Sequence, residues 1–223
     1  MSLAVRSLAE EQMDADDLSP ETYAAVIADL AKVNRLTLSA RPTLSFIKRA
    51  ARGRPFRLLD IGFGHGDMLR AIATRFPHGE LVGVDLNPRS EPAARAATPP
   101  DVPIRYVTGD YADLANQRWD LIVSSLVAHH MSHAQLVAFV AFMDRHARMG
   151  WLINDLHRHR LAHFGYPILA RIMGWHKMVR EDGTLSIARS YRPDEWPPIL
   201  DEAGVSARVH RAFPYRLCVE RIS

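Results

Sequence analysis

Hydrophobic positions in the middle of the chain occur in short runs that alternate with segments of helical spacing. The runs begin after a break at residues 53–55 (Gly-Arg-Pro), and each is followed by a polar turn or a helical pattern. They cover residues 57–61, 80–85, 104–108, 119–124 and 151–153. Such alternation is typical of a parallel sheet that carries helices on both faces. The pattern therefore predicts an α/β fold.

Two helices are expected before this sheet. Ser19 is the predicted N-cap of the first, with Pro20 in its first turn, and apolar residues then recur at helical spacing at Tyr23, Val26, Ile27, Leu30 and Val33. A second helix is expected to end at Ala51. We interpret residues 1–52 as an N-terminal helical lid.

The last third of the chain departs from the alternating rhythm. Residues 155–180 have a helical pattern rich in aromatic residues and methionine, and a turn at Asp182-Gly183 and an extended segment over 185–188 are expected to follow. A helix over 193–203 and strands over 207–211 and 216–221 complete the chain. We expect one domain over 1–223, with a core of 53–154, a helical insertion of 155–190 and a closing helix and strands over 191–223.

Composition supports a folded protein of one domain. The 223 residues are 48% hydrophobic and 24% charged, which is sufficient for a core and unlike a disordered chain. The net charge of +3 is weak evidence for a nucleic-acid partner. The single cysteine, Cys218, excludes an internal disulfide and suits a reducing compartment. No signal-peptide pattern is recognised at the N-terminus. Residues 161–179 are too often interrupted by charged and histidine side chains to form a membrane span, so a cytoplasmic location is expected.

Three glycines, Gly62, Gly64 and Gly66, follow the first predicted strand. Glycines in such a loop permit a tight turn and a close approach of the backbone to a ligand. A dinucleotide fingerprint requires the third glycine one position later, where this chain has Asp67, and the Gly-Lys-Ser/Thr of a phosphate-binding Walker loop is missing. Both phosphate-binding interpretations are therefore weakened.

Carboxylates stand at the ends of the first three predicted strands. Asp60 precedes the glycines, where it would repel a pyrophosphate but would suit a ligand with an ammonium group. Asp85 closes the second strand 19 residues after Gly66, the offset at which an acid can accept from both ribose hydroxyls of an adenosine. Asp110 follows the third strand and is placed to accept from an adenine amino group.

With these motifs the chain resembles the class I S-adenosylmethionine-dependent methyltransferases. The resemblance rests on residues 60–66 (Asp-Ile-Gly-Phe-Gly-His-Gly), 84–86 (Val-Asp-Leu), 109–111 (Gly-Asp-Tyr) and the segment 119–131. It implies a Rossmann-like sheet of seven strands, mostly parallel with the last antiparallel, and S-adenosylmethionine lying across the strand ends. The implied cofactor-binding residues are Asp60, Gly62, Phe63, Gly64, Gly66, Asp85, Leu86, Asp110, Tyr111 and Ser125.

Two further likenesses indicate the class of acceptor. The fourth-strand segment, which ends in a His-His-Leu-like triplet, is similar to that of quinone-biosynthesis C-methyltransferases. Residues 30–36 and 151–159 look like those of methyltransferases found beside bacterial type III polyketide synthases. These likenesses imply a small, apolar aromatic, quinol or polyketide acceptor, and residues 155–190 would cover it. A homodimer is compatible with the sequence.

His129 and His130 are the expected catalytic residues. Methyl transfer to a phenol or enol requires removal of a proton, and a neutral imidazole can accept one near pH 7. We expect the hydroxyl oxygen to be the target. Adjacent residues at a strand end point to opposite sides, so one of the two is expected to face the substrate. The alternative is that both cap the following helix beside Ser132.

The sequence contains two other candidate arrangements, a metal site after the fifth strand and a lid contact to the cofactor. Asn154, Asp155 and His157 follow the fifth strand and could bind a metal as in catechol-type methyltransferases, although an Asn-Asp pair also commonly caps a turn, and no metal is assigned. In the N-terminal lid, Asn34 and Arg35 could close over the cofactor, with Arg35 pairing with its carboxylate. The alternative is a surface helix with a solvated Arg35.

Two rival functions remain open. A nucleic-acid methyltransferase would carry an Asn/Asp-Pro-Pro-aromatic motif after the fourth strand, which this chain lacks, and Cys218 is not placed as a nucleophile. We therefore expect no nucleic-acid partner. The second rival is an adapter that keeps cofactor binding without catalysis. Intact Asp60, Asp85 and Asp110 argue for cofactor binding but do not prove turnover.

Overall fold

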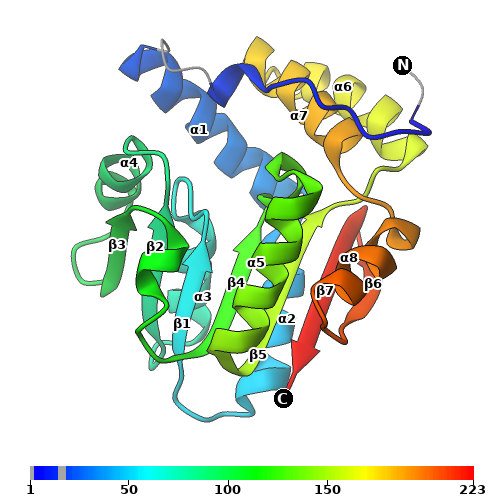
Figure 1. Cartoon of the computed structure of the whole chain (residues 1–223). Coiled ribbons are helices and arrows are strands. Elements are labelled where there is room, and N and C mark those ends of the chain that lie inside the picture. The colour runs from blue at the N-terminus through cyan, green and yellow to red at the C-terminus, as the bar shows by residue number, and fades with distance from the viewer. Residues whose placement is uncertain (1–2, 15–18) are drawn as a thin grey trace.

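The fold is built on one seven-stranded sheet, with the strand order β3-β2-β1-β4-β5-β7-β6 (Figure 1). The structure is a computed structural model that describes residues 3–14 and 19–223, so residues 1–2 and 15–18 of the predicted lid lie outside the described residues. Strands β1 to β5 pair in parallel, and β7 runs antiparallel to both of its neighbours. The predicted fold class is confirmed. The strands are β1 (Arg57–Ile61), β2 (Glu80–Asp85), β3 (Ile104–Thr108), β4 (Trp119–Ser125), β5 (Ala147–Leu156), β6 (Arg208–Ala212) and β7 (Arg216–Ile222).

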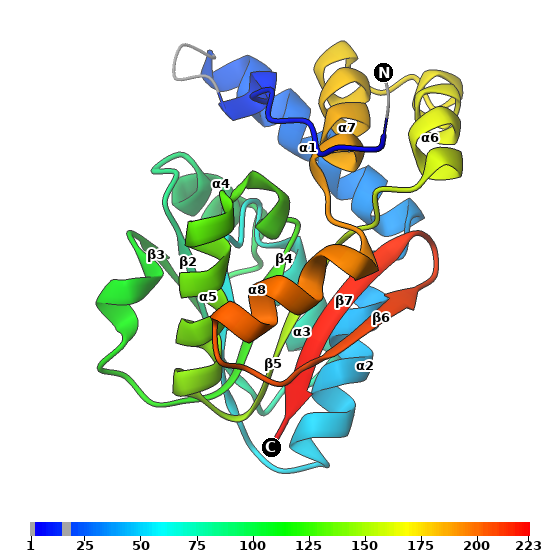
Figure 2. The same ribbon diagram turned by 45° about the vertical axis from the view of Figure 1, so that its right-hand side comes forward.

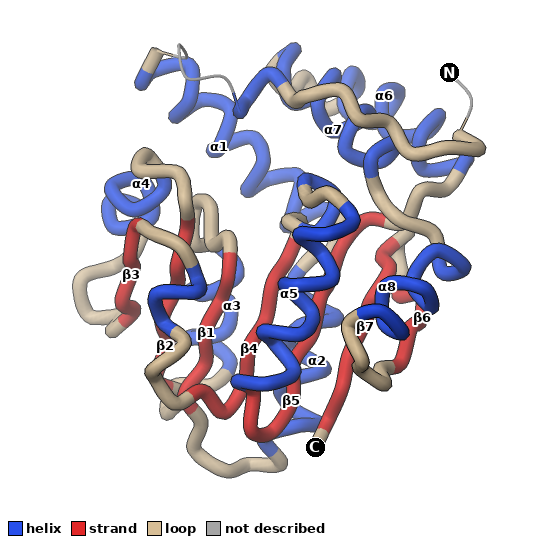
Figure 3. Tube along the Cα trace, viewed as in Figure 1, coloured by secondary structure: helices blue, strands red, loops and turns tan. Residues whose placement is uncertain are grey.

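Helices cover both faces of the sheet, as the two-sided burial of the apolar strands requires (Figure 3). On one face lie α5 (His133–His146) and α8 (Trp196–Glu202), packed around Trp119, Trp151 and Trp196. The other face carries α2 (Ala40–Ala51), α3 (Asp67–Arg75) and α4 (Ser90–Ala97). Helix α2, which we had assigned to the lid, therefore belongs to the packing of the sheet.

A helical cover stands over the carboxyl ends of the parallel strands (Figure 2). It consists of α1 (Pro20–Leu36), α6 (Arg160–Ile172) and α7 (Lys177–Arg189), which share an apolar cluster that includes Val26, Val33 and Trp175. The short helix η1 (Gln12–Asp14) joins this cover, because the backbone amides of Gln12 and Met13 donate to the carboxylate of Asp182 over 3.0 and 2.9 Å. The predicted N-cap is confirmed: the Ser19 side chain accepts from the Thr22 amide.

The sequence pattern was wrong for the segment 182–188. The expected turn and extended run are the second half of α7. Gly183 is needed there for close packing, since a Cβ atom at this position would lie 2.4 Å from ring atoms of Tyr166 on α6. Glycine in this helix therefore marks a helix–helix contact, a role that single-chain spacing does not reveal.

Two further differences concern β4 and β5. Strand β5 spans ten residues, against the expected 151–153, because β7 pairs with it from Gly150 to Leu156. His129 and His130 do not lie on β4, which ends at Ser125, but on the short 3₁₀ helix η3 (Ala128–His130). The remaining short helices are η2 (Tyr111–Leu114) and η4 (Pro193–Glu195). In the part of the chain that the structure describes, no helix has the length and apolar character that crossing a bilayer demands.

Candidate active site

A cavity of about 480 Å³ lies between the strand ends and the helical cover, a volume in the range of small-molecule sites. The glycine loop forms its floor, and the side chains of Ser125, His129 and His130 lie in its wall. Most of the rest of the wall is apolar and comes from the cover. These apolar residues include Ile27, Leu30, Val33, Leu161, Leu169 and Ile187.

The glycine loop after β1 has the backbone that its sequence predicts. Gly62, Gly64 and Gly66 all have positive φ angles, of 77°, 52° and 74°, which disfavour other residues. A Cβ atom at Gly62 would lie 2.3 Å from Val127, whereas nothing lies within 4 Å of one placed at Gly64. The loop therefore packs tightly on one side and leaves room for a ligand on the other.

Asp60 is a buried acid without a partner. Its side chain belongs to a residue that is 1% exposed, and neither carboxylate oxygen has a hydrogen bond among the described residues. Burial, with the nearby charges of Asp67 and Asp85, raises the pKa of Asp60 to about 8. The Ser125 hydroxyl at the end of β4 is also buried and unpaired. An orphaned acceptor beside an open glycine loop fits the ammonium end of S-adenosylmethionine.

The predicted adenosine-binding residues lie at the ends of β2 and β3, outside the cavity. Asp85 accepts from the amides of Gly64 (2.8 Å) and Asn87 (2.9 Å), and burial raises the pKa of its carboxyl group. Leu86 is exposed, and Asp110 is an exposed N-cap that accepts from the Ala112 amide. Phe63, in the loop after β1, is largely buried but is one of the residues that line the cavity, and Tyr111 packs on Phe139 and Phe142. Their cofactor contacts stay predictions.

His129 is held between two carboxylates, those of Asp155 and Glu11. Its Nδ1 lies 2.7 Å from Oδ1 of Asp155, and its Nε2 lies 3.6 Å from Oε1 of Glu11. Burial by itself lowers the pKa of His129, but Asp155 and Glu11 outweigh it and raise the pKa to about 9. At neutral pH His129 is therefore an imidazolium, and not the neutral imidazole that we expected.

His130 is the more accessible member of the pair. Its side chain is 31% exposed, and its Nε2 lies 3.9 Å from the second carboxylate oxygen of Glu11. The two histidine rings are 4.2 Å apart and both reach Glu11, whereas a strand would have pointed them to opposite sides. The 3₁₀ helix explains the difference, because successive side chains there are separated by about 120°. The side chain that caps α5 is that of Ser132, which accepts from the Gln135 amide.

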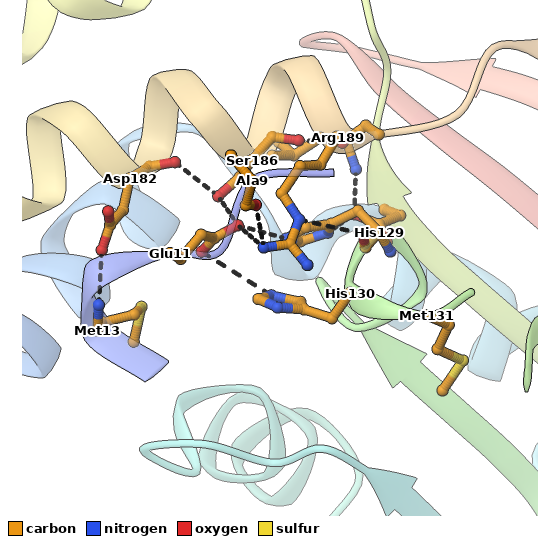
Figure 4. A network of polar contacts seen from close by, with 12 residues as sticks. Ala9, Glu11, Met13, His129, His130, Met131, Asp182, Ser186 and Arg189 are labelled. Atoms are coloured by element: carbon orange, nitrogen blue, oxygen red, sulfur yellow. Dashed lines mark hydrogen bonds and ion pairs between the residues drawn. The ribbon is translucent and has the colours of Figure 1, made fainter. Parts of the chain in front are cut away.

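Glu11 is the functional candidate that sequence reasoning missed. It is 4% exposed, and it accepts from the Ser186 hydroxyl at 2.9 Å and lies 3.9 Å from the Arg189 guanidinium (Figure 4). Burial raises the pKa of Glu11, but the hydrogen bond and charge of His129 more than reverse this, so that the pKa is lowered. The ligand atoms of Glu11, His129 and His130 lie within 4.8 Å of one another, close enough to hold a metal ion. No motif marks this glutamate in the sequence.

The residues of the earlier metal hypothesis serve other contacts. The Asn154 amide donates to the Ser39 carbonyl and the Thr43 hydroxyl, at 2.8 and 3.0 Å, and Asp155 holds His129. Burial and the charge of Arg211 lower the pKa of His157 to about 4. This finding favours the structural alternative for Asn154 and His157.

The two predicted lid residues have different surroundings. Asn34 lies in the cavity wall, and its amide donates to the carboxylate of Asp67 at 3.0 Å, which ties α1 to the start of α3. Arg35 is exposed and is not a lining residue. The alternative of a solvated Arg35 is therefore the one that the structure favours.

The raised pKa of His129 predicts a pH-dependent stability. The folded protein holds a proton up to about pH 9 that the unfolded chain releases near pH 6.5, so the free energy of unfolding should fall between these values, by on the order of 1–3 kcal/mol. Asp60, whose pKa is raised to about 8, changes the stability with pH in the same direction. The contribution of His129 is therefore measured as the difference in the free energy of unfolding between the parent and a His129→Gln variant, from urea titrations at each pH. If the free energy of unfolding changed equally with pH in both proteins, the raised pKa of His129 would be contradicted.

Comparisons with known proteins identify relatives that are methyltransferases. Residues 58–150 match the family described as "Methyltransferase domain". The demethylmenaquinone methyltransferase of Roseiflexus castenholzii is 30% identical over 175 residues, which cover 70% of each chain. A tRNA1(Val) (adenine(37)-N6)-methyltransferase of Porphyromonas gingivalis is 38% identical over 85 residues, 34% of this chain, and the chain spans only about a third of that relative's length.

Solved structures share the fold over nearly the whole chain. The plantazolicin methyltransferase BpumL in complex with SAH superposes with a TM-score of 0.69 at 16% identity, covering 95% of this chain and 92% of that one. Human N-acetylserotonin methyltransferase in complex with SAM gives a TM-score of 0.65 at 14% identity, with 92% and 56% covered. With the sequence relative that matches over two thirds of both chains, these findings place the protein: it belongs to the S-adenosylmethionine-dependent methyltransferases.

Proposed function

We propose that the protein transfers a methyl group from S-adenosylmethionine to a hydroxyl oxygen of a small, apolar aromatic, quinol or polyketide acceptor. The observation that carries the proposal is the apolar cavity that joins the glycine loop to His129 and His130. The relatives include enzymes named for demethylmenaquinone and trans-aconitate, which supports a small acceptor.

The residues around the cavity have separable roles. When bound, the cofactor supplies an electrophilic methyl group on a positively charged sulfur. The glycine loop and Asp60 would hold its amino-acid end, Asp85 its ribose and Asp110 its adenine, with Leu86 and Tyr111 beside the base. The helical cover excludes water from the cavity and positions the acceptor for in-line attack.

We assign removal of the acceptor proton to His130. The residue lines the cavity and is partly exposed, so its imidazole can reach a hydroxyl group. His129 is held as a cation by Asp155 and Glu11, so it would instead stabilise the negative charge that develops on the acceptor oxygen. His130 would thus accept the proton, and His129 would provide the positive charge.

The experiment is a reaction with isotopically labelled S-adenosylmethionine and, in separate arms, either a panel of phenols, pyrones and quinols or tRNA, analysed by mass spectrometry. The expected product carries the label on a hydroxyl oxygen of an apolar member of the panel. Label on carbon would overturn the oxygen assignment, and label on tRNA would favour the nucleic-acid rival that one relative's name raises. Tight binding of the cofactor without turnover of any substrate would favour the adapter.

Replacing Asp85 by alanine is expected to weaken binding of S-adenosylhomocysteine about tenfold or more. The variant would lose two charge-assisted hydrogen bonds to the ribose, each worth roughly 1.5–3 kcal/mol before water compensates, and the loop contact to Gly64. Isothermal titration calorimetry measures the loss. Asp113→Ala, at an exposed acid of η2, is the matched control, and equal affinity of both variants would remove Asp85 from the site.

Location and assembly are part of the same proposal. We place the enzyme in the cytoplasm, where the single cysteine, Cys218, would stay reduced, and it is free and buried in the structure. The expected homodimer and the absence of a nucleic-acid partner remain predictions. Light scattering tests the first, and release of bound nucleic acid at high salt tests the second.

A further inference from the structure

Arg216 brings an unused positive charge to the wall of the cavity. It is the first residue of β7, and because β7 runs antiparallel to β5, this residue pairs with Leu156 at the carboxyl ends of the parallel strands. The residue is 2% exposed to solvent, yet it is one of the residues that line the cavity. A guanidinium group in this position can meet a ligand without meeting bulk water.

The guanidinium group of Arg216 is largely unpaired within the described part of the chain. Its Nε and Nη1 have no hydrogen-bond partner, and Nη2 makes one long contact of 3.5 Å to the hydroxyl of Thr37. Burial lowers the pKa of Arg216, while Asp155 and Asp67 act in the opposite sense, but neither forms an ion pair with it. A buried charge of this kind costs several kcal/mol unless something neutralises it.

The other buried arginines show that the fold normally supplies partners. Arg158, also 2% exposed, pairs with the carboxylate of Glu195 and donates to the carbonyls of Leu3 and Ser190. Arg189 donates to the carbonyl of Ala9 at 2.9 Å and lies 3.9 Å from Glu11. Of these three buried arginines, Arg216 is the one without an ion-pair partner among the described residues.

We propose that Arg216 binds an anionic group of a ligand in the cavity, such as a carboxylate or an ionised acidic enol. Its Nε and Nη1 have no partner among the described residues, and the guanidinium carries the positive charge that a carboxylate neutralises. Because the rest of the cavity is mostly apolar, the anion would be carried on an apolar body. Two sources share this chemistry, the acceptor and the carboxylate of the cofactor. The acceptor source rests on the proposed function, and the binding measurements below need no turnover.

The first test asks whether Arg216 is retained for function and not for stability. Arg216→Met keeps the volume and removes the unpaired charge, so its melting temperature should equal or exceed that of the parent. Arg158→Met is the matched control, because it removes a fully buried guanidinium that has an ion-pair partner and two carbonyl acceptors, and it should lower the melting temperature by about 5 °C or more. An equal loss in both variants would make Arg216 a structural residue and overturn the proposal.

The second test identifies the source of the anion by calorimetry on the parent and Arg216→Met. If the acceptor carries it, 6-pentylsalicylate should bind the parent about 30-fold more tightly than 3-pentylphenol, and the variant should lose this preference. If the cofactor carries it, S-adenosylhomocysteine should bind the variant about 30-fold more weakly, with 5′-methylthioadenosine, which lacks the carboxylate, unchanged. Arg216→Lys should restore part of either loss. No change in both arms would overturn the proposal.

Discussion

Alanine in place of His130 is expected to lower kcat about 100-fold or more and to leave the affinity for S-adenosylhomocysteine unchanged. General-base catalysis contributes roughly 10²–10⁴-fold, and His130 lines the cavity, whereas Asp85 does not. Steady-state kinetics with an acceptor identified from the labelled panel measures the effect.

The control for this experiment is His133→Ala, which lies three residues away. His133 is exposed on α5, with its Nε2 2.7 Å from Glu202, and it is not a lining residue of the cavity. Its replacement should leave kcat within about twofold, since the exposed side chain lies outside the cavity. A His130→Ala enzyme as fast as this control would show that transfer depends on positioning alone or on another base.

Alanine in place of Asp155 should lower the free energy of unfolding by about 3–5 kcal/mol. The change leaves the buried His129 without the carboxylate 2.7 Å from its Nδ1, and it also removes the acceptor for the His129 backbone amide. Removing one partner of a buried ion pair has a cost of this size, because the other charge stays buried. Urea titrations at pH 7 measure the loss.

Two companion variants sharpen this prediction. Asp155→Asn keeps an oxygen that can accept from His129, so its loss should be smaller than that of the alanine variant. Asp120→Ala removes a carboxylate that is 3.6 Å from the exposed Arg148 and should cost less than half as much as Asp155→Ala. A loss below about 1 kcal/mol for Asp155→Ala would contradict a buried ion pair with His129.

The sheet could be predicted because its parallel strands have a local signal in the sequence. Buried parallel strands are continuous apolar runs, and β1, β2 and β3 have the bounds that their runs indicate. The second half of α7 could not be found in this way. Its Asp182-Gly183 pair is typical of a turn, and the helix continues because Tyr166 packs against the glycine, a contact between segments 17 residues apart.

The residues of the candidate site also differ in whether a local motif marks them. Asp60, the glycines and the histidine pair stand next to strand ends, so a motif could find them. Glu11 and Arg216 carry no motif, and their significance comes from burial and from partners that are far away in sequence or missing. The charge state of His129 was wrong for the same reason, since the pKa follows from a carboxylate 26 residues away and another 118 residues away.

The contacts of the N-terminal segment affect when the parts of the site can assemble during translation. Arg6 donates to the carbonyl of Arg189, and Glu11 accepts from Ser186, so residues 6 and 11 are bound by residues that are translated 183 and 175 positions later. At a translation rate of about 5–20 residues per second, the segment waits roughly 10 to 35 seconds for these partners. The nascent chain can form strands β1 to β5 during this interval, but the polar wall around His129 is completed only after Ser186 and Arg189 have been synthesised.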